Sequence, residues 1–353
     1  MNVLDFYTSS KKREALKELL TLAGQKHRAG LPPNFLEKDI WVTEILRLLY
    51  DEKFLGDMSV AFKGGTALSK CWKAIERFSE DIDLSIHWAD LAAAEDETKA
   101  WKASVQSGNQ QQKFRKQQQD RLMVWSGNLV EKLNERFAQY GIDELKAELD
   151  LDSKGEKVNI HFPRVTANDS DYQLDYVLLE FGGRNRGRPT KLHEVKCYLS
   201  EVDELSVIQC PEANVQAYDA DYVLWEKLTA LHQFSTQERD PNMNRLARHW
   251  YDVDCLLQAG FADPLSSQQA MNDVVEMKAY RWAEKGVDYH LASSGGLKLV
   301  PDCDRLTGIA KDHQEAIDGG MFFNTPDGFD VIIERIRKIQ DEINASTNKS
   351  SSV

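Results

Sequence analysis

The sequence contains no long uninterrupted run of apolar residues. No segment of the 353 residues approaches the roughly 18 uncharged apolar residues of a membrane-spanning helix. The opening residues, MNVLDFYTSSKKREALKELL, lack the apolar stretch and small-residue cleavage site of a secretory signal peptide. These absences predict a cytoplasmic protein without a membrane partner.

Cysteine is also scarce. The chain has five cysteines, an odd number, and none of them stands in a CxxC pair. Scattered thiols of this kind are typical of reduced cysteines and exclude a disulfide framework or a structural zinc site. Any bound metal would therefore take oxygen ligands.

Basic residues are outnumbered by acidic ones. The chain has 44 Lys and Arg against 57 Asp and Glu, for a formal net charge of −13. This balance excludes a protein that coats nucleic acid without specificity, because such binding requires Lys and Arg to neutralise phosphates. A polyanionic substrate must meet a local basic patch, for which residues 182–196, GGRNRGRPTKLHEVK, are a candidate. A flexible basic loop without a partner is the alternative.

What is present predicts a sizeable core, since 42% of the residues are apolar. Two helices are expected between residues 10 and 50. A strand at 58–62 and a helix at 66–75 flank a Lys63-Gly64-Gly65 turn. Residues 81–88 alternate strictly between apolar and polar side chains, which predicts a half-buried strand with a polar face.

The rest of the chain divides into a strand-rich part and a helical part. Residues 92–119 are polar and Gln-rich, which predicts an exposed helical insertion or a mobile lid. A helix is expected at 120–140. Strands are then expected at 157–165, 172–181, 193–199 and 205–210, and helices at 220–234, 243–258, 268–285 and 329–344.

These elements predict an α+β fold in two domains. The first domain, residues 1–215, would hold a mixed sheet, the N-terminal helices and the polar insertion. The second, residues 216–345, would be mostly helical, and residues 346–353 would form a disordered tail.

The residues that carry chemistry lie in FKGGTALSKCWKAIERFSEDIDLSIHW, positions 62–88. A glycine pair lets the backbone approach a phosphate, and the helix that follows directs amide N–H groups to the same place. Asp81 and Asp83 project side by side from one strand face, where a cation relieves their repulsion. Such hard oxygen ligands suit Mg²⁺ or Mn²⁺. Two aspartates that merely solvate an outer strand face are the alternative reading.

This stretch resembles the polymerase-β nucleotidyltransferase superfamily and, more closely, the AbiEii/AbiGii toxin family, to which the MenT toxins are related. The resemblance runs from near the start of the chain to about residue 260. It rests on LEKDIWVTEIL (36–46), KGGTALSK (63–70), RFSEDIDLSI (77–86), LEFGGR (179–184), EKLTAL (226–231) and RHWYDVDCL (248–256). Two positions depart from the pattern, namely Thr66 in place of Ser and His249 in place of Asp.

The resemblance implies a polymerase-β-like nucleotidyltransferase domain and a role for each matching residue. Asp81, Asp83 and Glu180 would be catalytic metal ligands, with Glu180 the third acid on a neighbouring strand. A phosphate-binding Lys227 and an orienting Asp252 would complete the catalytic set. The nucleotide would be bound by Lys63, Gly64, Gly65, Thr66, Lys70 and Ser79. For Lys227 and Asp252, a solvated lysine and an intrahelical ion pair with Arg248 are the alternatives.

The implied reaction is Mg²⁺-dependent transfer of a nucleoside monophosphate from an NTP to an acceptor hydroxyl. By the resemblance the acceptor is the 3′ end of tRNA, and the protein is the toxin of an abortive-infection type IV toxin–antitoxin system, active in phage defence, with a cognate antitoxin protein as partner. Three alternatives stay open: transfer to a protein hydroxyl, a nucleotide-binding regulatory or interaction protein without transferase activity, and a metal-dependent nuclease.

Overall fold

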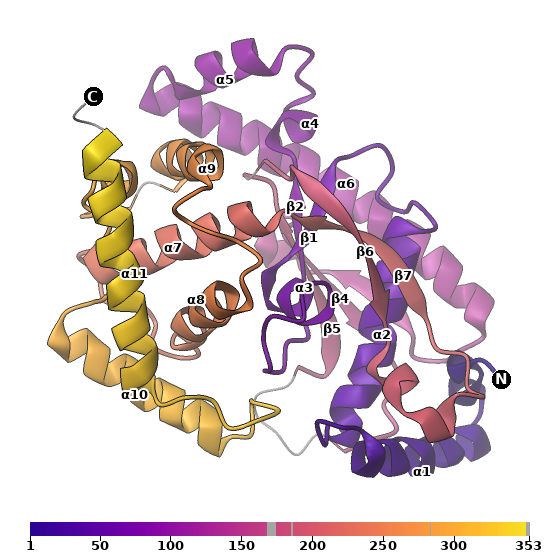
Figure 1. Ribbon diagram of the computed structural model, residues 1–353. Coiled ribbons are helices and arrows are strands. Elements are labelled where there is room, and N and C mark those ends of the chain that lie inside the picture. The colour runs from indigo at the N-terminus through magenta and orange to yellow at the C-terminus, as the bar shows by residue number, and fades with distance from the viewer. Residues whose placement is uncertain (168–173, 185, 283, 351–353) are drawn as a thin grey trace. The chain divides into compact units, whose positions relative to one another are not determined.

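The computed structural model describes residues 1–167, 174–184, 186–282 and 284–350 (Figure 1). The chain forms two compact units. The first unit comprises Met1–Cys71 and Phe78–Tyr218, and the second comprises Trp72–Arg77 and Asp219–Val353. The division after Tyr218 lies close to the predicted boundary at 215. The segment Trp72–Arg77 belongs to the second unit. The predicted division at a single boundary assigned this segment to the first domain.

A seven-stranded mixed sheet forms the centre of the first unit, in the order β3-β4-β5-β2-β1-β7-β6. β2 pairs in parallel with β5, and β1 with β7, while the other neighbours are antiparallel. The strands are β1 Val60–Lys63, β2 Ile82–Ile86, β3 Lys146–Leu149, β4 Lys157–His161, β5 Tyr176–Gly182, β6 Thr190–Lys196 and β7 Glu212–Tyr218. A mixed sheet in one unit and helices in the other confirm the predicted α+β class.

The helices of this unit begin where the sequence supplies suitable first residues. Pro33 occupies the first turn of α2, where a missing N–H costs no hydrogen bond. The side chain of Ser107 caps α6 by accepting from the amide of Gln110. The helices are α1 Ser10–Lys26, α2 Pro33–Tyr50, α3 Gly64–Lys70, α4 Trp88–Ala92, α5 Glu97–Val105 and α6 Gly108–Tyr140, with short 3₁₀ turns η1 Val3–Thr8, η2 Leu151–Ser153, η3 Tyr198–Glu201 and η4 Asp203–Leu205.

Helix α6 covers one face of the sheet. Trp125 of α6 packs edge-on against Phe181 of β5, with the ring centroids 5.1 Å apart. Because side chains alternate along a strand, Glu180 next to Phe181 points to the opposite face. Helix α6 therefore leaves the Glu180 side of β5 uncovered.

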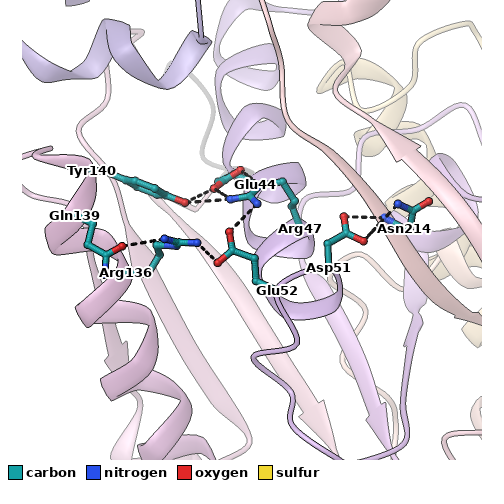
Figure 2. A network of polar contacts seen from close by, with 8 residues as sticks. All are labelled: Glu44, Arg47, Asp51, Glu52, Arg136, Gln139, Tyr140 and Asn214. Carbon is teal, nitrogen blue, oxygen red and sulfur yellow. Dashed lines mark hydrogen bonds and ion pairs between the residues drawn. The ribbon is translucent and has the colours of Figure 1, made fainter.

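Ion pairs and hydrogen bonds join the C-terminal ends of α2 and α6 (Figure 2). Arg47 donates to Glu44 and to Glu52, each at 2.7 Å, and Arg136 of α6 pairs with Glu52. Asp51 accepts hydrogen bonds from Asn214 of β7. Apart from the buried Glu44, these charges are exposed or only partly buried, so we expect them to fix the orientation of the helices more than to stabilise the fold.

The second unit is helical. Its helices are α7 Ala220–Thr236, α8 Arg248–Ala259, α9 Gln268–Arg281, α10 Cys303–Asp318 and α11 Phe329–Ser350, with a 3₁₀ turn η5 Tyr289–Ser293. Trp225 and Trp250 lie in its core, and their indole N–H groups donate to Ser267 Oγ and to the Leu299 carbonyl. Because each indole N–H has a hydrogen-bond partner, the two large rings can be buried without leaving a polar group unsatisfied.

Several predicted elements need correction. The run 205–210 is not a strand, because η4 ends at Leu205 and Val207 is 78% exposed. Strands β3 and β7 and helix α10 were not predicted. In β7 the buried alternate positions include two alanines, which give a weak apolar signal. Positions 172 and 173 of one predicted strand and position 283 of a predicted helix lie outside the described residues.

The polar insertion and the C-terminal tail both contain helix. Residues 92–119 contain α5 and the first third of α6, which agrees with the predicted alternative of a helical insertion. Helix α11 continues to Ser350 through the first part of the predicted disordered tail, and residues 351–353 lie outside the described part of the chain. Among the described residues, no helix combines the length and apolarity needed to cross a bilayer.

Candidate active site

The side chain of Asp83 packs against the backbone of Gly64, the first residue of α3 after β1. Gly64 has φ +74°, a left-handed conformation that favours glycine. A Cβ added to Gly64 would lie 1.8 Å from Oδ2 and 2.5 Å from Cγ of Asp83. The Asp83 carboxylate therefore rests directly on the glycine backbone, and only glycine leaves room for it.

Asp81 stands immediately before β2, two residues before Asp83, a spacing that places two side chains on the same side of an extended chain. Its backbone carbonyl accepts a hydrogen bond from Thr66 Oγ1 at 2.6 Å, and Ser79 Oγ lies 3.0 Å from the same hydroxyl. Thr66 is buried, so it ties the first turn of α3 to the start of β2. Oδ1 of Asp81 is buried and has no hydrogen-bond partner among the described residues.

A row of charged residues crosses four strands at this level of the sheet. Lys63 of β1 is in register with Asp83 of β2, Asp83 with Glu180 of β5, and Glu180 with Lys157 of β4. Residues in register point to the same face, so two adjacent carboxylates are flanked by two lysines. Gly65, in the first turn of α3, follows directly on the glycine that supports Asp83.

These residues fit a divalent cation of the Mg²⁺ type. A buried carboxylate oxygen without a hydrogen bond costs free energy, which a hard cation would recover. Within the described residues, no group of three or more His, Cys, Asp or Glu side chains is already gathered as a metal cluster. Asp81 and Asp83 are thus the pair of oxygen donors that the fold presents, with Glu180 beside them in register.

A buried ion pair holds the chain just before Asp81. Lys38 of α2 lies 2.8 Å from Glu80, with side-chain exposures of 2% and 7%. Lys38 also donates to the Leu174 carbonyl, and Glu80 accepts from the Leu174 amide. Burial lowers the pKa of Lys38 and raises that of Glu80, and each charge opposes the shift of the other. Sequence reasoning missed these two positioning residues, although both lie within matching motifs.

Lys70 has a different environment from the one expected of a nucleotide ligand. Its ammonium forms a buried ion pair with Asp39 of α2 and donates to the Lys196 carbonyl at 2.9 Å. It also lies 4.0 Å from the centroid of the Tyr198 ring. Contact with a nucleotide would break this buried pair, so we assign Lys70 to the fold rather than to the nucleotide site.

The basic run at 182–196 does not form one free patch. Arg188 forms an ion pair with Glu97 of α5, and Lys196 lies 3.3 Å from Glu194. Position 185 lies outside the described residues. Arg184 is set apart from these pairs, because it lines a separate hollow beside α6.

Lys227 and Asp252 meet in the second unit. Asp252 Oδ2 is 2.8 Å from Lys227 Nζ, and Arg77 donates to both oxygens of the same carboxylate at 2.7 and 2.8 Å. Burial alone raises the pKa of Asp252, but Arg77 and then Lys227 outweigh it and hold the pKa well below its usual range. Asp252 thus pairs with two cations from distant parts of the chain, an arrangement that differs from the alternative of a simple intrahelical pair with Arg248.

Asp252→Asn is expected to lower the free energy of unfolding by about 3 kcal/mol, because it leaves the buried Arg77 and Lys227 charges without their counterion. Urea unfolding at pH 7 measures the change. Asp254→Asn on the same helix is the matched control. Asp254 is also buried, but its partner Arg335 has a side chain 35% exposed that water can solvate once the pair is lost, so we expect a smaller cost than for Asp252→Asn. Equal costs for both variants would contradict the prediction.

His249 stands among three cations. Burial, and then the charges of Lys227 and Arg248, lower its pKa to about 3. A histidine whose pKa is lower in the folded than in the unfolded protein stabilises the fold fully above about pH 6.5 and loses that contribution as the pH falls towards 3.

We therefore expect the wild type to lose about 1–2 kcal/mol more than His249→Gln between pH 7 and pH 5. Urea unfolding of both proteins at the two pH values tests this. Other groups that titrate in this range contribute equally to the two proteins, so the difference isolates His249. Identical losses would show that protonation of His249 does not oppose folding.

A mixed sheet that presents paired aspartates beside a glycine turn is an arrangement of the nucleotidyltransferase class. A family model described as "Nucleotidyl transferase AbiEii toxin, Type IV TA system" matches residues 47–335, well over half of the chain. The chain belongs to this family and is a nucleotidyltransferase. Matching residues extend beyond the predicted limit near 260, whereas LEKDIWVTEIL at 36–46 lies outside the match.

Among solved structures, the chain is similar to MenT4, a nucleotidyltransferase toxin from Mycobacterium tuberculosis H37Rv. The two are 14% identical, with a TM-score of 0.44, and the comparison covers 95% of this chain and 98% of that one. A search of curated proteins finds no match.

Proposed function

We propose that this nucleotidyltransferase transfers a nucleoside monophosphate from an NTP to the 3′ hydroxyl of tRNA, with Mg²⁺ or Mn²⁺ as its cofactor. One observation supports the proposal above all: the Asp83 carboxylate packs against Gly64, and Asp81 lies two residues before Asp83. Oδ1 of Asp81 is buried and has no hydrogen-bond partner among the described residues. In the reaction, the acceptor oxygen bonds to the α-phosphorus as the bond to pyrophosphate breaks.

The chain's own residues would position the reactants. Gly64 and Gly65 would let the triphosphate approach the backbone, and Lys63 would offset its charge. Thr66 and Ser79 keep this turn attached to the start of β2 through their hydroxyls. Lys227, whose ammonium Asp252 orients, is the proposed further phosphate ligand.

Asp81 and Asp83 would hold the metal, and Glu180 would be its third carboxylate. When bound, Mg²⁺ would neutralise triphosphate charge and lower the pKa of the acceptor hydroxyl. Exposed Glu180 shares the register of Asp83, so both carboxylates can serve the same group only if a cation offsets their repulsion.

The family places the chain in type IV toxin–antitoxin systems. We accordingly propose a cytoplasmic toxin that blocks translation by capping the tRNA acceptor end, is restrained by a cognate antitoxin protein and takes part in phage defence. Family membership supports this role, and the paired aspartates support the chemistry.

The test is to incubate purified protein with Mg²⁺, total RNA and each of the four NTPs labelled at the α-phosphate. Labelled tRNA, resolved by gel electrophoresis, is the expected product, and withholding Mg²⁺ should prevent its formation. If the label appears on protein and not on tRNA, the acceptor is a protein hydroxyl. Shortened RNA would indicate a nuclease, and no label with any NTP would contradict the transferase proposal.

A further inference from the structure

A basic hollow lies in the first unit between α6 and the turn that joins β3 to β4. Its volume is about 920 Å³. The cations that line it come from the polar half of α6, the turn and the segment after β5, and they are Lys113, Arg115, Lys116, Lys154 and Arg184. Asp120 is the single carboxylate among the described residues of its lining. In a chain of net charge −13, this concentration of positive charge is unusual.

Two arginines of this hollow, Arg115 and Arg184, act on each other across it. Burial, and then the charge of Arg184, lower the pKa of Arg115. Glu156 lies 3.8 Å from Arg184, with both side chains more than a third exposed. Groups that repel in the free protein gain free energy when an anion sits between them.

The turn also connects the hollow with the row of charged residues at the proposed active site. Lys157, directly after the turn, is in register with Glu180, which is in register with Asp83. The amide of Phe181 donates to the Glu156 carbonyl at 2.7 Å, so the turn is attached to β5. Neighbouring strands are about 4.8 Å apart, which places Lys157 about 10 Å from Asp83. The turn that supplies Lys154 to the hollow is thus attached to the strand that carries Glu180.

We infer that the hollow lined by α6 and Arg184 binds the phosphate backbone of the RNA acceptor, at a distance from the reacting hydroxyl. The inference rests on the proposed transferase function and deepens it. It also assigns a role to the polar, Gln-rich segment, because Lys113 and Lys116 lie in it. Glutamine side chains beside the cations, Gln112 and Gln119, add donors suited to phosphate and ribose oxygens.

The test compares two double variants that remove equal charge. Lys113→Gln with Lys116→Gln alters the hollow, and Lys17→Gln with Lys132→Gln alters exposed lysines on α1 and on the far half of α6. Binding of a fluorescein-labelled single-stranded RNA is measured by anisotropy over a range of salt concentrations, with bulk tRNA as competitor and without NTP. All four lysines lie on the surface of helices, so thermal unfolding should be alike for the three proteins.

The hollow variant should bind RNA at least about tenfold more weakly than wild type near 0.1 M salt, and the slope of log K against log salt should become shallower by about 1.4, or 0.7 for each lost phosphate contact. The control should bind within twofold of wild type. Titration with each NTP should give unchanged affinity for the hollow variant, because the source of the bound phosphate is RNA.

Equal RNA affinity of the two double variants would overturn the inference, as would a hollow variant that loses NTP affinity and keeps RNA affinity. Because no NTP is present in the RNA assay, its outcome is separate from that of the transferase test. If the wild type labels tRNA but the two double variants bind RNA equally well, the hollow is not the RNA site. The proposed transferase function would be unaffected by that result.

Discussion

Asp83→Asn is expected to lower nucleotide transfer by at least about a thousandfold, equivalent to about 4 kcal/mol of transition-state stabilisation. An amide cannot supply the negative charge that a divalent cation needs, although its shape still fits over Gly64. We expect the same loss for Asp81→Asn, because the proposed metal site needs the carboxylates of both aspartates.

The fold should tolerate both substitutions. Removing one of two neighbouring negative charges relieves repulsion in the metal-free protein, so the unfolding temperature should change little. Addition of Mg²⁺ with NTP should raise the unfolding temperature of the wild type but not of either variant, since a ligand stabilises only the state that binds it.

The measurement is the initial rate of labelling of tRNA from the preferred NTP. Asp57→Asn is the matched control, an exposed aspartate in the same unit that should keep full activity. Activity of Asp81→Asn or Asp83→Asn within tenfold of wild type would rule out these carboxylates as metal ligands.

Gly64→Ala should reduce transfer to a similar extent, by a different route. The new Cβ would lie 1.8 Å from Oδ2 of Asp83 and 2.8 Å from its Cβ. No rotation of the Asp83 side chain alone relieves the clash with its Cβ, so the carboxylate must leave its present position. We therefore expect about a thousandfold loss of activity, as for removal of the carboxylate itself.

Gly56→Ala separates this effect from backbone strain. Gly56 has φ +68°, close to the +74° of Gly64, but a Cβ added there meets nothing within 4 Å. Both variants bear the cost of a left-handed alanine, about 1 kcal/mol, and only Gly64→Ala displaces Asp83. Rates of tRNA labelling and urea unfolding distinguish them, and equal activity of the two variants would refute the close-contact argument.

Local patterns in the sequence were enough to predict most helices and the central strands. The strict alternation at 81–88 predicted β2, and the proline pair at 32–33 predicted the start of α2. These features work because helix and strand periods are imposed by residues close together in the chain. Strand β7 was not predicted, because alanines at its buried positions carry little apolar signal.

Register and long-range pairing could not be predicted in this way. The sequence suggested Glu180 as a third acid only by its resemblance to a family, and the pairing of β2 with β5 places it beside Asp83. The burial of Lys70 against Asp39, and of Asp252 against Arg77, depends on residues far apart in the chain. For isolated charges, a solvated surface side chain was the natural expectation.

The sequence by itself determined the chemical class of this protein, because the order of glycine turn, helix and paired aspartates can be read from adjacent residues. Only the tertiary structure decided which charges are available to a substrate. A charged side chain becomes a structural counterion or a free ligand according to what the fold places within a few ångströms of it, and that distance is not encoded in any local pattern.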